Sequence, residues 1–457
     1  MYIFDEIFKY TSVMKFICTF LLAAIFYFSY AQSDSTKNLK NDTIKGMRWA
    51  FLPVVSYDSD LGLKYGAIVT AYQFGNGKLY PDYVYNISYE LDLTTKGAIS
   101  SQLFFDSGKL LKSGKHRIVA DFSIIREQAA DFYGFNGAAS TYNVDLSKEG
   151  SADYVSRMYY KFDRNIIRLT GDWHEKLNDK WAVFGGIHHY GYKQKVVDID
   201  KLNKGKNVGN MLPDTFTLYE RYCNTGIIDS VDADGGNVTL IRAGVVYDTR
   251  DIQFNPTKGF WLEGMIAASP KFPWIEKPFV KASVILRNYL PIKDRRLTLA
   301  SRIAWQDAIG SKAPFYFMPY VSQSFCNNTI AEGLGGAKTL RGILRNRIWA
   351  DGFFYGNLEL RWSAARFRAI NQNLEIKLSP FYDFGIITDR ASFPIYLSIS
   401  GYPAIGLYSR KDSWHHSAGL GVHFVMNENF ILSVDYGLSF NPNDGNSGFY
   451  LGTGFLF

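Results

Sequence analysis

The stretch Leu374 to Gly385, LEIKLSPFYDFG, alternates between two kinds of side chain along its length. One face carries Leu374, Ile376, Leu378, Pro380, Tyr382 and Phe384, and the other carries Glu375, Lys377, Ser379, Phe381, Asp383 and Gly385. Successive side chains of a β-strand point to opposite faces, so this pattern predicts a strand with one apolar and one mixed face. Strands of soluble sheets are usually about five or six residues long, whereas a tilted strand that crosses a bilayer needs about 9–11. The stretch therefore favours a membrane-spanning strand.

The same alternation recurs from Arg48 to the last residue, for example in VKASVILRN (280–288) and LASRIAW (299–305). No stretch of useful length has the helical period of about 3.6 residues. The alternation predicts sixteen strands, at residues 48–57, 61–74, 82–93, 97–106, 116–126, 155–171, 180–196, 237–249, 259–268, 278–290, 295–307, 353–365, 374–388, 414–426, 429–439 and 448–457. We therefore expect an all-β fold, a 16-stranded antiparallel transmembrane β-barrel over residues 48–457.

The lengths of the connections support this topology. The long connections are residues 127–154, 197–236, 308–352 and 389–413, and each follows an odd-numbered strand. In an up-and-down meander, all connections that follow odd strands lie at one end of the sheet. Outer-membrane barrels have short periplasmic turns and longer extracellular loops. We therefore expect these four connections to be extracellular and the chain to lie in the bacterial outer membrane.

The N-terminus predicts export. MKFICTFLLAAIFYFSYAQ, from Met14 to Gln32, has one lysine, then a long apolar core that ends at Ala31. This is the pattern of a signal peptide, so we expect residues 1–31 to be removed by cleavage before Gln32. Translation can start at Met1 or at Met14. Residues 32–47 are polar, which predicts a disordered segment before the barrel.

Composition narrows the possible partners and chemistry. The net charge is +7 without a dense basic run, so nucleic acid is not expected as a partner. Cys223 and Cys326 are too few for a disulfide framework, and their pairing stays open. The glycine-rich stretch GLGGAKTLRGILRNR (333–347) is not a Walker A loop, because Ala337 separates Gly336 from Lys338. We predict no catalytic residue, cofactor or metal site.

The last eight residues, YLGTGFLF (450–457), alternate like the other strands. Gly452 lies on one predicted face, and Phe455 and Phe457 lie on the other. This ending resembles the recognition signal of bacterial outer-membrane barrels. The resemblance implies that Gly452, Phe455 and Phe457 form an assembly signal, with Phe457 in the aromatic girdle at the membrane interface.

Three further stretches resemble the BamA/TamA-type family of outer-membrane insertases and translocases, also called the bacterial surface antigen family. The first is YDTRDIQFNPTKGFWLEG (247–264), which matches the family's turn at Asp248, Arg250, Asp251, Pro256 and Gly259. The second is GGAKTLRGILRNR (335–347), where Leu340 replaces the usual valine and Ile343 the usual aromatic residue. The third is FYDFG (381–385), and the three occur in the family's order.

The resemblance implies that the loop with the second motif folds back into the barrel lumen. Family precedent pairs its arginine, Arg341, with an acid on each of two strands. In FYGNLELRW (354–362), the apolar side chains face lipid, so Glu359 faces inward by alternation, as does Asp383. We therefore expect Arg341, Gly342, Glu359 and Asp383 to clamp the loop, because an unpaired charge in a confined interior is costly.

The resemblance also implies a non-enzymatic protein that assists the insertion or translocation of polypeptides, or of lipids. Members of the family usually carry periplasmic POTRA domains before the barrel, and only residues 32–47 stand there after the predicted cleavage site. We therefore expect separate periplasmic or membrane protein partners, besides contact with outer-membrane lipid and lipopolysaccharide. The alternatives are a passive channel or porin, a structural subunit of an outer-membrane complex, and a barrel hydrolase. The client stays open.

Overall fold

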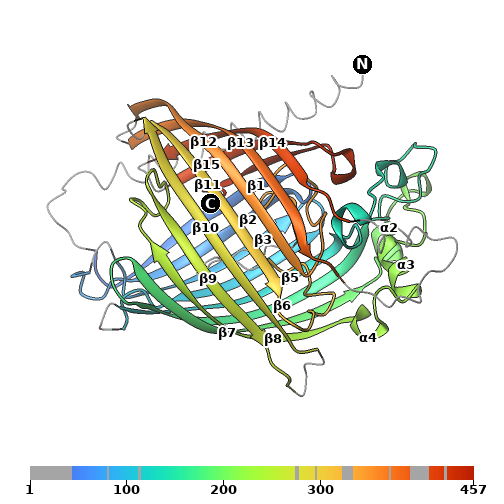
Figure 1. The fold of residues 1–457 in the computed structure, drawn as a ribbon, viewed down its shortest axis with the longest axis horizontal. Coiled ribbons are helices and arrows are strands. Elements are labelled where there is room, and N and C mark those ends of the chain that lie inside the picture. Colours follow the sequence, from blue (N-terminus) through green and yellow to red (C-terminus); the bar gives the residue numbers. More distant parts are fainter. Residues whose placement is uncertain are drawn as a thin grey trace.

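The strands close into one antiparallel barrel (Figure 1). The computed structural model describes residues 44–79, 82–111, 115–272, 277–293, 296–321, 333–369, 372–391, 411–426 and 430–457. Each strand pairs with its neighbours in the sequence, and the first pairs with the sixteenth. The predicted sixteen-stranded barrel is therefore confirmed.

The strand bounds follow the predicted ranges closely. They are β1 Met47–Asp58, β2 Gly62–Gln73, β3 Tyr85–Thr94, β4 Ala98–Asp106, β5 His116–Asp131, β6 Lys161–Lys176, β7 Trp181–Lys195, β8 Gly235–Asp248, β9 Gly259–Ser269, β10 Phe279–Lys293, β11 Leu297–Ala308, β12 Gly352–Ala369, β13 Gln372–Asp389, β14 His415–Met426, β15 Phe430–Ser439 and β16 Ser447–Thr453. Several predicted ends were wrong. Strands β5 and β6 each run five residues beyond the predicted ends at 126 and 171. Residues 155–160 form turns before β6, because Tyr159 and Tyr160 pack into a loop cluster. Residues 454–457 leave the sheet after β16, because Gly454 turns the chain with a φ of 80°.

The two faces of the barrel differ in polarity. Large apolar side chains such as Ile167, Leu169 and Ile187 are exposed on the outer face. Charged side chains are buried on the inner face, where they pair across strands: Arg168 Nε lies 2.6 Å from Asp121. An apolar outer band around a polar interior is the arrangement that lipid and a confined lumen require.

Three connections carry the helices of the described residues, and the α-helices all lie in the long connection from β7 to β8. These are α2 (Ile199–Asn203), α3 (Leu218–Asn224) and α4 (Ser230–Ala233), with 3-10 turns at Gly137–Ala139, Val144–Leu146, Val208–Asn210 and Pro442–Asp444. The α-helices lie together at one end of the barrel (Figure 1), which we call the loop end. We call the opposite end the turn end. Within the part of the chain that the structure describes, every helix is too short to cross a membrane.

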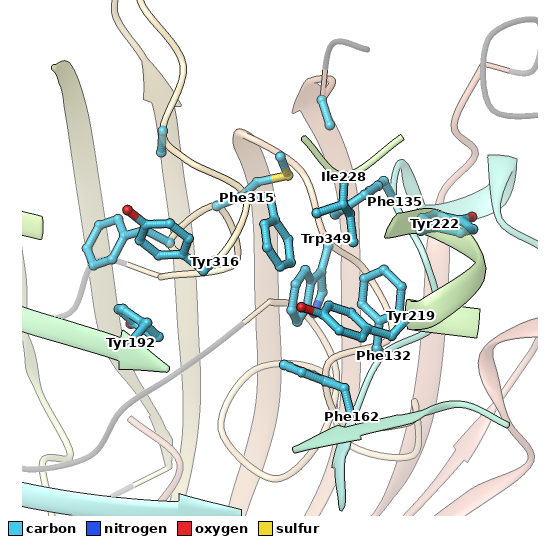
Figure 2. Close-up of a cluster of buried hydrophobic side chains, with 14 of the residues drawn as sticks. Phe132, Phe135, Phe162, Tyr192, Tyr219, Tyr222, Ile228, Phe315, Tyr316 and Trp349 are labelled. Atoms are coloured by element: carbon cyan, nitrogen blue, oxygen red, sulfur yellow. The ribbon is translucent and has the colours of Figure 1, made fainter. Parts of the chain in front are cut away.

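Aromatic residues from separate loops pack together at the loop end (Figure 2). Trp349, in the connection from β11 to β12, is fully buried at the centre of this cluster. Its ring lies 5.2 Å from that of Phe132, in the connection from β5 to β6, and Tyr219 of α3 contacts Phe132 at 5.9 Å. Phe315 stacks on Trp349 at 6.4 Å. The loops therefore share one apolar core at this end of the barrel.

Candidate functional site in the lumen

The connection from β11 to β12 folds into the barrel. Leu334 and Ile348 form an isolated antiparallel bridge, which closes the inserted segment into a compact loop. Leu340 and Ile343 at its tip are 0% and 1% exposed, and they pack against inward side chains of the wall, including Tyr355 of β12. Ile343, which stands where the family has an aromatic residue, therefore serves as an apolar anchor of the loop.

Arg341 extends from this loop into a ring of acids. Its Nε and Nη2 donate to the two carboxylate oxygens of Asp383, both at 3.0 Å, and its backbone N–H donates to Asp383 at 3.0 Å. Its Nη1 forms an ion pair with Glu359 Oε1 at 2.8 Å. Arg341 is 1% exposed, and both acids are 0% exposed. The structure therefore brings together the three charged residues that the sequence singles out.

Two further residues of this ring escaped the sequence analysis. Asp435 of β15 lies 3.7 Å from Nη1 of Arg341. The guanidinium carbon of Arg341 stands 3.6 Å from the ring centre of Phe381, a cation–π contact in a buried place. Phe381 shares the inward face of β13 with Asp383, and alternation along residues 429–439 also marks Asp435 as inward, so both left a signal in the sequence.

Gly342 allows the loop to touch the barrel wall next to the seam between β1 and β16. Its φ is 88°, and an added Cβ would lie 2.7 Å from the backbone of Gly437 in β15. Its N–H donates to the hydroxyl of Tyr450 in β16 at 3.0 Å. A side chain at this position would therefore be strained by its backbone angle and by contact, and it would push the loop off β15 and β16.

The next two arginines of the loop reach other parts of the barrel. Arg345 donates its N–H to Asp60, in the turn after β1, at 3.1 Å, and its Nη1 pairs with Glu127 at 2.8 Å. Arg347 Nη2 donates to the carbonyl of Ser140 at 2.6 Å. The basic residues of the stretch 333–347 thus fasten the loop to the wall and to a neighbouring loop.

The family turn motif lies at the turn end, between β8 and β9. Arg250 donates from Nε and Nη2 to the two oxygens of Asp248, both at 2.9 Å, and its guanidinium stands 4.6 Å from the ring centre of Trp261. Gly259 has a φ of 99°, and an added Cβ would meet the carbonyl oxygen of Thr249 at 2.2 Å. The glycine is therefore required by the close approach of the two sides of the turn.

Asp251 organises the tip of the same turn. Its carboxylate accepts hydrogen bonds from the backbone N–H and the hydroxyl of Thr257, at 2.9 and 2.6 Å. Burial acts to raise the pKa of Asp251, but the hydrogen bonds from Thr257 and Lys258 outweigh it and hold that pKa below its ordinary value. Pro256 is buried beside these contacts. The turn is therefore a rigid unit fixed by its own side chains.

The pairing between β1 and β16 is short. Tyr57 opposes Leu451 and Asp58 opposes Tyr450. Beyond these pairs, Ser59 donates its N–H to the carbonyl of Phe449 at 3.2 Å. On its other side, β1 pairs with β2 along the whole of Met47–Asp58. Among the described residues, the edge of β1 from 47 to 56 that faces β16 therefore has no paired strand.

Comparison with known proteins agrees with this geometry. The model of the Omp85 superfamily domain matches residues 134–457, most of the chain and all three lumen and turn motifs. The chain belongs to the Omp85 superfamily. It is an outer-membrane barrel of a family that inserts or translocates proteins, and barrels of this family are generally non-enzymatic.

Solved structures share the fold of this Omp85 superfamily barrel. BamA from Haemophilus ducreyi lacking POTRA domains 1–3 is similar over 90% of this chain and 71% of that chain, with 15% sequence identity and a TM-score of 0.56. CdiB from Escherichia coli is similar over 89% of this chain and 63% of that chain, with 13% identity and a TM-score of 0.52. The chain thus spans less than two thirds of the CdiB chain. Comparison with curated protein sequences gives no match.

The end of this Omp85 superfamily barrel differs from the sequence expectation. Phe457 is 8% exposed and packs on Tyr289 and Ala300, which are fully buried inward residues of β10 and β11. The expected place of Phe457 in an interfacial girdle was therefore wrong. The physical reason is the turn at Gly454, together with cationic side chains inside the lumen that attract aromatic rings. The role of Gly452, Phe455 and Phe457 in assembly stays a prediction.

Several predictions fall partly or wholly outside the described residues. The signal peptide at 1–31, most of the polar segment at 32–47, and Cys326 lie there. Cys223, on α3, is half-buried and has no disulfide partner among the described residues, so its pairing with Cys326 stays open. Within the described ranges, no group of three or more histidine, cysteine or acidic residues is placed to hold a metal ion.

Proposed function

We propose that this barrel assists the insertion of polypeptides into the outer membrane, or their translocation across it, at the seam between β1 and β16. The observation that carries the proposal is the unpaired edge of β1 from Met47 to Ser56. The proposal includes export directed by residues 1–31 and cooperation with separate periplasmic proteins.

An unpaired strand edge in lipid is energetically unfavourable. Each backbone N–H or C=O without a partner in the hydrocarbon region costs on the order of several kcal/mol. An exposed edge binds an incoming strand through main-chain hydrogen bonds that are independent of sequence. Trp49 and Phe51 beside this edge are 74% and 65% exposed, so apolar surface accompanies the free hydrogen-bonding groups. A polypeptide that enters as a strand would satisfy both.

The lumen favours the seam over a passive channel. A porin needs an open aqueous path along the barrel axis. Here the loop with Arg341 is buried inside the barrel, and the aromatic cluster around Trp349 packs at the loop end. The clamp also contacts the seam strand directly, because Gly342 binds Tyr450 of β16 at 3.0 Å. The loop therefore supports the seam from inside and occupies part of the lumen, which favours the seam over a passive channel.

A disulfide across the seam tests the proposal. Tyr57→Cys with Leu451→Cys places two thiols at directly opposed positions of β1 and β16. We expect the oxidised protein to lose its ability to support folded, heat-modifiable outer-membrane proteins in cells that depend on it, and reduction to restore it.

The matched control keeps the first cysteine and moves the second to the other neighbour of β1. Tyr57→Cys with Leu63→Cys joins β1 to β2, which are paired along their whole length. This variant should remain active when oxidised. Full activity of the oxidised β1–β16 variant would refute the seam as the route.

A further inference from the structure

Three basic residues gather on the outer face of β5 to β7 near the loop end. Arg126 of β5 and Lys193 of β7 are each directly opposed to Asn165 of β6, which stands between them. Lys195 is the last residue of β7 and lies two positions beyond Lys193 on the same face. All three basic side chains are exposed. The strand register therefore places three positive charges around one polar residue.

The three positions are close enough to hold one small anion. Neighbouring strands lie about 4.7–4.9 Å apart, so the backbones of Arg126 and Lys193 are roughly 10 Å apart, with Asn165 between them. The long side chains of arginine and lysine can close this distance over Asn165, whose amide group adds a donor. Arginine binds phosphate with its planar fork and lysine binds it as a point charge. The patch thus has the donors that a phosphate group requires.

Much of the positive charge in this patch is not compensated. Within the described parts of the chain, the side chains of Arg126 and Lys193 form no ion pair. An acid, Asp163, lies on the same face by alternation and is 7% exposed. It accepts a hydrogen bond from Asn165 at 3.3 Å, and Lys195 Nζ lies 3.7 Å from it. Lys195 therefore offsets the acid, and the other two cations remain available for a ligand from outside the chain.

The patch stands at the edge of the apolar outer band. One step toward the turn end, the outward residues of β5 and β6 are Ile124 and Ile167, which are 46% and 51% exposed. The next step carries Phe122 and Leu169, which are also exposed. Lysine and arginine beside an apolar band lay their alkyl stems along it and hold the charge at the polar boundary. The three charges therefore lie where lipid headgroups meet the barrel.

The opposite wall has a different edge at the loop end. Strand β14 lies halfway around the ring from β6. Outward aromatic rings gather there, with ring centres 5.9 Å apart for Trp414 and Phe384 and 6.3 Å apart for Phe440 and Tyr382. Aromatic girdles mark the membrane interface of outer-membrane barrels. The interface at the loop end is thus aromatic on one wall and basic on the other, so the basic patch is a local feature.

We propose that Arg126, Lys193 and Lys195 form a binding site for a phosphate group of lipopolysaccharide. The predicted topology puts the loop end at the outer leaflet, where lipopolysaccharide carries phosphate on the sugars next to its acyl chains. The phosphate binds the three cations, and the acyl chains lie on Ile124 and Ile167. Lipid contacts the barrel on all sides, whereas this patch fixes one phosphate at one place. The site goes beyond the proposed function and does not depend on it.

Binding of fluorescent lipopolysaccharide to the purified full-length chain in detergent tests the site. We expect the Arg126→Gln, Lys193→Gln, Lys195→Gln variant to bind it about tenfold more weakly, or worse, because the charges that face the phosphate are removed. Lipopolysaccharide stripped of its phosphates should bind the unmodified chain as weakly. The substituted side chains are exposed on the outer face, so the variant keeps the packing of the barrel.

The matched control removes three exposed cations at the turn end, by Lys176→Gln, Lys180→Gln and Arg368→Gln. This variant changes the net charge equally and should bind lipopolysaccharide like the unmodified chain. Binding that the loop-end variant leaves unchanged, or that both variants weaken equally, would overturn the proposal. Displacement by inorganic phosphate, or by an equal amount of phosphatidylglycerol, would also overturn it, because the patch would then accept a free anion or any phospholipid.

Photocrosslinking in living cells tests the place of the site in the membrane. With p-benzoylphenylalanine in place of Asn165, between the cations, we expect an adduct that stains as lipopolysaccharide. The same group in place of Lys180, at the turn end, should give none. Equal lipopolysaccharide adducts from both positions, or none from position 165, would contradict the proposal. A failed seam test would leave this site standing, and failed lipopolysaccharide binding would leave the proposed function standing.

Discussion

Arg341 holds the lumen loop because every part of its side chain has a partner. Arginine offers five donors in a planar fork that suits two carboxylates. Asp383 receives the bidentate contact, Glu359 the ion pair at 2.8 Å, and Phe381 lies under the guanidinium plane. Loss of one partner leaves an uncompensated buried charge, which destabilises the whole group of residues around Arg341.

The first prediction concerns this ring. Removing one partner of a buried ion pair costs about 3–5 kcal/mol. We expect Arg341→Ala to free the loop, which lowers the temperature of heat modification or opens a leak to ions and large antibiotics. Asp383→Ala should act similarly, and the double variant should be less than additive, because the residues share one interaction.

Arg366→Ala is the matched control for the first prediction. Its pair with Glu375 has a similar length, 2.9 Å, but the Arg366 side chain is 50% exposed, and exposed pairs contribute at most about 1 kcal/mol. An Arg341→Ala variant that is as stable and as impermeable as Arg366→Ala would refute the prediction that Arg341 clamps the loop.

Alternation placed Glu359 and Asp383 on the inward face, and the family motif pointed to Arg341. Alternation could not reveal which inward residues contact each other, because contact across strands depends on register and on the path of the loop. Asp435 and Phe381 were missed for this reason, although alternation places both inward. The contacts of Arg302 and Arg361 with the rings of the tail after β16 were missed as well, because nothing in the strand pattern shows that the tail turns inward.

At the scale of elements, the short tail and the turn between β8 and β9 carry the most specific structure. We predict that deleting Phe455 to Phe457 lowers the level of folded, heat-modifiable protein in the outer membrane. The deletion removes both ring contacts of Arg361 and its hydrogen bond at 3.0 Å to the main-chain oxygen of Phe457, so the charge is left in the lumen with fewer partners. Unchanged levels would show that neither lumen packing nor assembly depends on these residues.

Gly259 provides a test of the family turn. A non-glycine residue at its φ of 99° is strained by about 1–3 kcal/mol, and the new Cβ would also meet the Thr249 carbonyl. We therefore expect Gly259→Ala to lower the unfolding temperature measured by heat modification. Gly209→Ala, in an open part of a long loop with no atom within 4 Å of the added Cβ, is the control and should have little effect. Equal stability of the two variants would contradict the account of this turn.

Strands were more predictable than their ends. Alternation found all sixteen, because each has one lipid face and one lumen face along most of its length. It failed at residues 155–160 and 454–457, where aromatic residues pack into the loop cluster or against inward residues of β10 and β11 instead of joining the sheet. A local period cannot distinguish these environments, because they are created by distant parts of the chain.

At the scale of the whole molecule, the long connections from odd-numbered strands give the barrel two different ends. We predict that the loop end faces the outside of the cell. A cysteine at Asn207, in the long connection from β7 to β8, should react with a membrane-impermeant reagent in intact cells. A cysteine at Asp179, in the short turn from β6 to β7, should react only after the outer membrane is opened. The reverse pattern would invert the topology.

The closed barrel and its uneven ends were predictable, whereas the packing of the loops at the loop end was not. Trp349 and Phe132 lie in different loops, and their ring contact at 5.2 Å depends on how the barrel brings those loops together. The short seam was equally hidden, because alternation suggested a last strand that continues to Phe457. The shape of the molecule thus follows from local patterns, while the packing of the lumen loop and the short pairing of β1 with β16 depend on long-range contacts.

The central claim is that polypeptides meet the barrel at the unpaired edge of β1. Site-specific photocrosslinking in living cells tests it most directly, with p-benzoylphenylalanine in place of Phe51 and, as the control, in place of Val69. These residues are directly opposed on β1 and β2, so they share a depth in the membrane and differ by one strand from the seam. We predict that newly made outer-membrane proteins, followed by pulse labelling, form adducts from position 51 and few or none from position 69. Equal adducts from both positions, or adducts with lipid alone, would contradict the claim.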